Sequence, residues 1–191
     1  MSLVMTTAPT VEPVTLADAK AHLRVDANAE DAFISSLIVT SRLHVEAALG
    51  LALVAQSWLL TLDAWPSSRT LELPLRPVLS VQSVAVRNAD GSLSTLAPSL
   101  YHLDRRSSPP RIVATASPMP TPAVVADGIE VRFTAGYGAL AGDVPAPIRH
   151  ALLLLVAHWF ENREPVGVGQ AATRIPDTVS ELLAPYRLVR L

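Results

Sequence analysis

The sequence predicts a mainly α (α+β) protein, a small helical bundle with a β-rich insertion between its second and third long helices. Apolar residues recur at helical spacing in two separate stretches, residues 28–50 and 148–163, as expected for the buried face of an α-helix. Between these stretches apolar residues alternate with polar ones, and most of the sixteen prolines occur there, which is typical of strands joined by turns. A chain of 191 residues has room for one domain with a sizeable insertion.

The first part of the helical core is expected at residues 15–54. Thr15 can cap a short helix, and Asp18 follows three residues later as in a capping box. Asn28 offers a second cap, after which apolar residues continue at helical spacing to Gly50, a typical C-terminal stop.

The β-rich insertion is expected at residues 55–137. A strand at 78–87, the turn residues 88–91 and a return strand at 93–96 predict a hairpin. Short strands are also expected around residues 58–62, 101–104 and 111–113, and an irregular proline-rich loop within 107–122.

The clearest strand signal lies near the end of the insertion. Ile129, Val131 and Phe133 alternate with the polar residues at 130, 132 and 134. One face of this strand is therefore expected to be buried and the other to face solvent.

The second part of the helical core is expected at residues 143–164. Pro145 and Pro147 precede an apolar helix, as proline often does near a helix start. The residues at 152–156 are apolar in every direction around the helix axis, so this segment is either buried on all sides or shared with neighbouring chains. Residues 165–191 are expected to form a C-terminal helix and tail.

Composition excludes several classes of protein. The chain has no cysteine, so disulfides, thiolate metal sites and cysteine nucleophiles are excluded. A net charge of −2 with scattered arginines does not predict sequence-specific nucleic-acid binding. The longest apolar run, 151–157, is too short for a membrane span, and residues 1–13 have no signal-peptide pattern. Half of the residues are hydrophobic and 17% are charged, so some apolar surface is expected to contact partners.

The sequence contains no recognisable catalytic, cofactor-binding or metal-binding pattern. None of the five histidines has metal-ligand spacing, and no serine lies in a nucleophile elbow. His158 and Glu161 lie three residues apart on one helix, where a surface hydrogen bond is commoner than proton-transfer catalysis. Gly136-Tyr137-Gly138 is too short for a phosphate-binding loop and predicts a turn. The protein is therefore not expected to be an enzyme, and a small hydrolase is a rival without candidate residues.

Five short motifs occur in a fixed order along the chain. They are Leu16–Val25, the acidic pair Glu30-Asp31, Phe133–Gly138, Val144–Ile148 and His158–Glu164. Together they resemble the phage head-tail connector (adaptor) family, including the adaptor proteins of gene transfer agents. The resemblance spans residues 15–191.

The resemblance implies a structural subunit of a tailed phage, prophage or gene transfer agent particle. Such a subunit forms a ring of about twelve copies on the portal protein, contacts tail or stopper proteins, and surrounds a channel through which DNA passes without sequence-specific binding. No membrane or cofactor is implied. Assembly is expected in the host cytoplasm, and the mature location is the head-tail interface of the particle. The alternative is a tail-completion or capsid-decoration protein in which the β-rich insertion makes the main contact.

Candidate interface residues are those with aromatic, apolar or arginine side chains near the C-terminus, a composition enriched at binding hot spots. They are Trp159, Phe160, Arg163, Tyr186, Arg187, Leu188 and Arg190. The first two can equally belong to the core. The segment 165–191 has the composition of a portal-docking arm, and the alternative is a frayed terminus.

Overall fold

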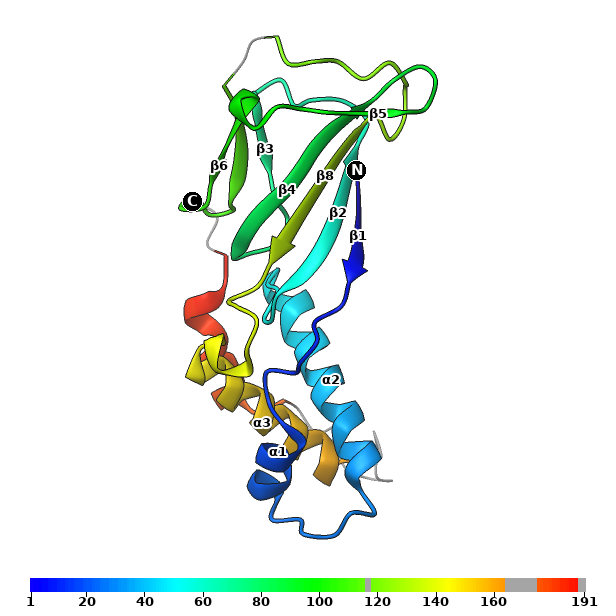
Figure 1. The fold of residues 1–191 in the computed structure, drawn as a ribbon. Helices are drawn as coiled ribbons and strands as arrows, with labels where there is room; N and C mark the ends of the chain where they lie inside the picture. Colours follow the sequence, from blue (N-terminus) through cyan, green and yellow to red (C-terminus); the bar gives the residue numbers. More distant parts are fainter. Residues whose placement is uncertain (116–117, 164–174, 189–191) are drawn as a thin grey trace, which may run out of the picture. The chain divides into compact units, whose positions relative to one another are not determined.

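The computed structural model describes residues 1–115, 118–163 and 175–188 (Figure 1). The chain forms two compact units, each with its own fold. The first, here called the β unit, consists of Met1–Pro9 and Gly50–Tyr137, and the second, the helical unit, of Thr10–Leu49 and Gly138–Leu191.

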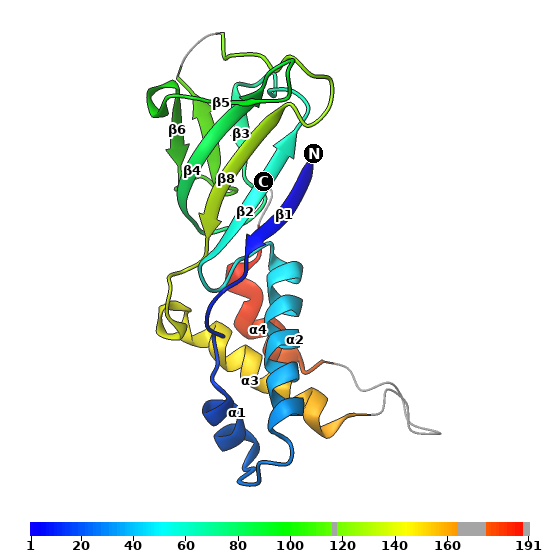
Figure 2. The same cartoon turned by 45° about the vertical axis from the view of Figure 1, so that its right-hand side comes forward.

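The β unit contains two antiparallel sheets (Figure 2). The order is β1-β2-β8-β4-β5 in the five-stranded sheet and β3-β7-β6 in the three-stranded sheet. The elements are β1 (Ser2–Thr7), β2 (Gln56–Leu62), β3 (Thr70–Glu72), β4 (Val78–Arg87), β5 (Leu93–Thr95), the 3₁₀ helix η1 (Pro98–Leu100), β6 (Tyr101–Asp104), β7 (Arg111–Ala114) and β8 (Ile129–Ala135).

The helical unit is built around two long helices, α2 and α3, which contact one another. Both of them also contact the short helix α1, and α4 contacts α3. The elements are α1 (Leu16–Leu23), α2 (Asp31–Leu49), the 3₁₀ helix η2 (Ala141–Asp143), α3 (Ala146–Glu161), α4 (Asp177–Leu183) and the 3₁₀ helix η3 (Ala184–Tyr186).

The expectation of a mainly α helical bundle is wrong. Within the described ranges the chain has four α-helices and eight strands in two antiparallel sheets, an α+β fold. The physical reason is that the β unit buries a core of its own, with Leu60, Val84 and Phe133 fully enclosed. The N-terminal segment adds β1 to this unit, a strand that the sequence analysis missed.

The central strand β8 carries the β core. Its residues Ile129, Val131 and Phe133 are all 0% exposed, as their alternation predicts. On one side β8 pairs with β2, where Val131 lies opposite Leu60 and Phe133 opposite Trp58. On its other side β8 pairs with β4, so every backbone hydrogen-bonding edge of this strand has a partner strand.

Glu130 is an exception to the expected alternation along β8. It lies between Ile129 and Val131 but is only 7% exposed. Arg87 of β4 donates a hydrogen bond to its carboxylate, and Arg132 Nη2 lies 3.3 Å from Glu130 Oε2. The polar face of β8 is therefore partly covered, and the buried negative charge is compensated by two arginines.

The helix starts show how local sequence sets the helical unit. The capping box at α1 is confirmed, because Thr15 Oγ1 accepts a hydrogen bond from Asp18 N at 3.1 Å. Asn28 has a different role from the expected cap. Its side-chain oxygen accepts a hydrogen bond from Lys20 Nζ at 2.8 Å, and the same ammonium lies 2.7 Å from Asp31 Oδ1. Lys20 thus connects the end of α1 to the start of α2.

Helix α3 is buried on one side only. Leu152, Leu155 and Val156 are at most 1% exposed, whereas Leu153 and Leu154 are half-buried. Burial on all sides within one chain is therefore wrong, and sharing of this helix with neighbouring chains stays a prediction.

Gly136 follows β8 in a conformation that favours glycine. Its φ is +143°, and a Cβ at this position would lie 2.5 Å from Ala55 N and 2.6 Å from Val54 C. Both atoms belong to the backbone, so no side-chain rotation can relieve the clash.

We expect Gly136→Ala to lower the free energy of unfolding by about 2 kcal/mol or more, because it combines a strained φ with a backbone clash. Thermal denaturation followed by circular dichroism measures this loss. Gly142→Ala is the control, since nothing lies within 4 Å of the position that its new methyl group would take and its φ is not positive. Equal stability of the two variants would contradict the assigned close approach.

Candidate docking surfaces

Three of the sequence-predicted interface residues lie together at the C-terminal end of α3. The Arg163 guanidinium carbon lies 4.6 Å from the centre of the Phe33 ring and 4.7 Å from that of Phe160. Arg163 Nη2 is also 2.9 Å from Glu30 Oε2. Arg163 therefore bridges α3 and α2 through two cation–π contacts and one exposed ion pair.

Trp159 extends this group of side chains. Its ring meets that of His44 edge to face, with 5.7 Å between centroids. We name the five side chains the aromatic–arginine cluster: Phe33, His44, Trp159, Phe160 and Arg163. The sequence analysis missed the two members on α2, because helical periodicity does not tell which residues of two distant helices meet. Trp159 and Phe160 are half-buried, so they support the packing of α3 and still present part of their rings to solvent.

The remaining predicted interface residues lie beyond α4. Val179 and Leu183 of α4 are buried. Directly after them, Tyr186 and Leu188 are half-buried and Arg187 is exposed. Arg190 lies outside the described residues, as does the segment 164–174. No observation tests whether any of these side chains contacts a partner, so their role stays a prediction, as do the domain limits expected from the sequence.

A buried ion network holds the N-terminal segment of the helical unit on α2. Arg42 Nε lies 2.7 Å from Glu12 Oε2, and Arg42 Nη1 lies 2.9 Å from Glu46 Oε2. The Arg42 side chain is only 7% exposed. Burial acts to lower the pKa of Arg42, but the hydrogen bonds and negative charges of Glu12 and Glu46 outweigh it, so this pKa is raised above its ordinary value.

An apolar hollow of about 330 Å³ lies beside this network in the helical unit. Val14 and Ile38, both 3% exposed, are among its lining residues. Val11, Val39 and Leu140 also line it and are 41%, 37% and 66% exposed. Exposed apolar side chains gathered around a hollow are typical of an interaction surface.

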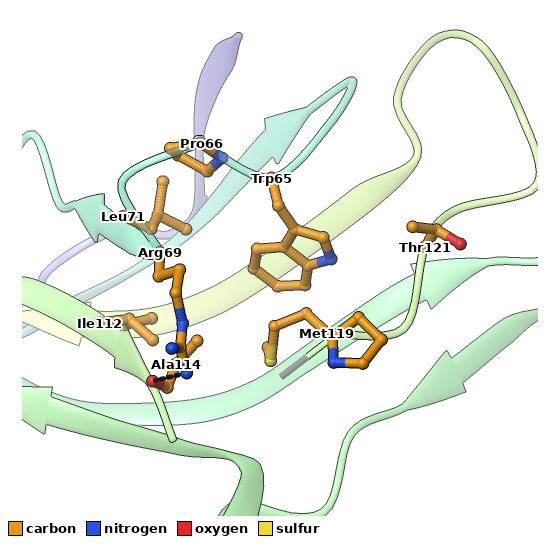
Figure 3. A pocket seen from close by; sticks show the side chains of 9 residues that line it. Trp65, Pro66, Arg69, Leu71, Ile112, Ala114, Met119 and Thr121 are labelled. Carbon is orange, nitrogen blue, oxygen red and sulfur yellow. Dashed lines mark hydrogen bonds between the residues drawn. The ribbon is translucent and has the colours of Figure 1, made fainter. Parts of the chain in front are cut away.

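The β unit has a separate apolar pocket of about 210 Å³ (Figure 3). In it the indole of Trp65 lies beside Met119, and Trp65 Nε1 donates a hydrogen bond to Pro120 O at 2.7 Å. Arg69 Nη2 donates to Ala114 O at 3.4 Å. The other lining residues are Pro66, Leu71, Ile112, Pro118 and Thr121.

These surfaces have the composition of docking surfaces. The pocket side chains are mainly apolar, and among the described residues no group of three His, Asp or Glu side chains is placed to hold a metal ion. Tryptophan, methionine and arginine are the residue types enriched where proteins bind one another.

Residues 13–95 match the family of phage gp6-like head-tail connector proteins. No curated protein sequence matches the chain.

Solved structures match over the full length. A chain of the virion of the native gene transfer agent (GTA) particle has a TM-score of 0.86 at 28% identity, and a chain of the neck of the empty GTA particle, computed with C6 symmetry, has a TM-score of 0.87 at 28% identity. A chain of the neck of the native GTA particle, computed with C12 symmetry, has a TM-score of 0.79 at 27% identity. Each comparison covers 100% of this chain and 97% of the other. The resemblance to head-tail connectors is thereby confirmed.

We expect Arg42→Met to lower the free energy of unfolding by about 2–4 kcal/mol, because it leaves two acidic side chains together without the positive charge between them. Chemical denaturation followed by the helical circular-dichroism signal measures this loss. The control is Arg163→Met, whose ion pair and ring contacts are exposed and contribute about 1 kcal/mol or less. Similar losses in both variants would show that burial of the Arg42 network adds no stability.

Proposed function

We infer that this chain is a structural head-tail connector subunit of the phage gp6-like kind, in the neck of a tailed-phage or gene transfer agent particle. The observation that carries the inference is the likeness over the whole chain to a subunit of GTA particle necks, at a TM-score of 0.87. The match of residues 13–95 to the connector family supports it independently.

We propose that about twelve copies form a closed ring. The neck structures that this chain resembles were computed with C6 and C12 symmetry. A closed ring requires two different contact surfaces on each subunit, one for each neighbour. The half-buried side of α3 and the hollow beside Val39 and Leu140 are apolar surfaces that such contacts would cover.

The ring is proposed to dock on the portal protein through the C-terminal segment and to present another face to tail or stopper proteins. The support is the position of Tyr186, Arg187 and Leu188 directly after α4, with Arg187 exposed and the other two half-buried. An aromatic and an arginine side chain next to each other form a composition typical of binding hot spots.

DNA is proposed to pass through the ring without sequence-specific binding. A channel wall must avoid dense positive charge, because every phosphate that a protein neutralises strengthens its hold on DNA. The net charge of the chain is −2. Several arginines are also paired with carboxylates, among them Arg42, Arg87 and Arg111.

The subunit is proposed to act without catalysis and without a membrane, and to assemble in the host cytoplasm. By length and composition alone α2 could cross a membrane, a test that the core helix of a soluble protein also passes. Ile34, Ile38 and Val45 of α2 are at most 3% exposed in the helical unit, and the charged pair Arg42–Glu46 lies in its C-terminal half. These features support a core helix.

A tail-completion or capsid-decoration protein is the second candidate, and the apolar pocket of the β unit favours it. In that case the pocket around Trp65 would make the main contact. Thr121→Trp, placed at the exposed rim of the pocket, would then abolish partner binding. In a connector that docks through its C-terminal segment, the same variant retains portal binding in a co-sedimentation assay.

We expect Arg187→Glu to weaken co-sedimentation with the portal protein of the same particle by about tenfold or more, because it reverses an exposed charge at the proposed contact. This substitution tests the proposed contact more specifically than removal of residues 165–191, because that removal would also take Val179 and Leu183 out of the core. Arg105→Glu, a charge reversal at an exposed arginine of the β unit, is expected to bind like the unchanged protein.

The outcomes separate two parts of the proposal. Equal portal binding by both variants in ring stoichiometry would refute the C-terminal contact and retain the connector. Failure of the unchanged protein to bind the portal would refute the connector, and the tail-completion candidate would replace it.

A further inference from the structure

Strand β1 leaves one edge of the five-stranded sheet open. It pairs with β2 from Ser2 to Thr7 and stands at the end of the strand order. Within the described residues its outer backbone N–H and C=O groups therefore have no partner strand. Such a row of groups is a template on which another extended chain can pair.

Most of this edge lacks the features that normally prevent pairing. Soluble proteins protect their edge strands with charged side chains, prolines, β-bulges or very short strands. A register shift interrupts β1 only between Met5 and Thr7, and Ser2 to Met5 pair regularly with β2. The β1 sequence Ser-Leu-Val-Met-Thr-Thr contains no charged residue and no proline. Val4 is 52% exposed and Met5 is 37% exposed, so both faces of the strand present apolar side chains to solvent beside the open backbone.

The opposite edge of the same sheet is also open. Strand β5 pairs with β4 alone, and all three of its residues are exposed. Its sequence Leu-Ser-Thr is uncharged, and Leu93 is 41% exposed. Each copy of the chain thus carries two uncharged edges that differ from one another, of which the β5 edge is only three residues long.

The strand directions allow these two edges to meet. From β1 through β2, β8 and β4 to β5 there are four antiparallel steps, so β1 and β5 run in the same direction. Placed side by side in neighbouring copies of equal orientation, they would pair as parallel strands. A contact between two different surfaces repeats around a ring, whereas β1 paired with a second β1 would end at a dimer.

We propose that β1 of one copy pairs with β5 of the next, so that the five-stranded sheet continues from subunit to subunit around the ring. This inference rests on the proposed function, because it requires the ring. The pairing would satisfy the open backbone groups of both edges and cover the apolar side chains of Val4 and Leu93.

The chain contains no cysteine, so a thiol cross-linker reacts only with cysteines that are introduced. A variant with both Val4→Cys and Leu93→Cys is mixed with the portal protein and treated with a short bismaleimide. We expect a ladder of cross-linked species up to the closed ring. The yield of cross-linked product should be about tenfold higher than for two cysteines that are not held side by side, because pairing raises the effective concentration of the two thiols. Mixing the two single-cysteine variants is expected to give a cross-linked dimer and nothing larger.

The matched control carries Val4→Cys with Leu43→Cys. Leu43 is a 47% exposed apolar residue on α2, comparable to Leu93 in exposure but neither on a sheet edge nor in the hollow beside Val39. A ladder from the control as strong as that from the test variant would overturn the proposed pairing. A dimer from Val4→Cys alone would also overturn it, in favour of β1 pairing with β1.

The failure of this inference can be distinguished from that of the proposed function. Portal binding in ring stoichiometry without a ladder overturns the strand pairing and retains the connector. A ladder without portal binding supports the pairing and refutes the portal contact. If neither the ladder nor portal binding is observed, both the strand pairing and the connector assignment are overturned.

Discussion

The pairing of β8 with β2 on one side and β4 on the other is the interaction on which the β unit depends. It places Ile129, Val131 and Phe133 in the centre of a core to which strands far apart in the sequence contribute. It also determines which strands remain at the edges. Because β8 occupies the middle, β1 and β5 are left at the two ends of the sheet, and the surface available to other chains follows from this order.

The helical unit is held by a different kind of interaction. Its long helices pack through apolar side chains, while Lys20 and Arg42 connect separate segments through ion pairs. The Arg42 network is buried and costly to break, whereas the Arg163 contacts at the end of α3 are exposed and weak. Removing Arg42 is therefore expected to cost more stability than removing Arg163.

Several separate surfaces of this protein suit contacts with other chains. In four regions apolar or backbone groups are not fully covered. They are the hollow beside Val39, the pocket beside Trp65, the aromatic–arginine cluster, and the open edges of β1 and β5. Several separate docking surfaces suit a subunit of a particle neck, where each copy contacts other chains.

The sequence by itself determined the local structure and the class of protein. Capping at Thr15, the stop at Gly50 and the burial of Phe133 follow from local patterns, and the ordered motifs indicated a head-tail connector. Only the tertiary structure decided that β1 joins the sheet, that Glu130 is buried under Arg87, and that the side chains of α2 complete the aromatic–arginine cluster. These features depend on contacts between residues distant in the chain, and periodicity reports which face of an element is apolar but not which element covers it.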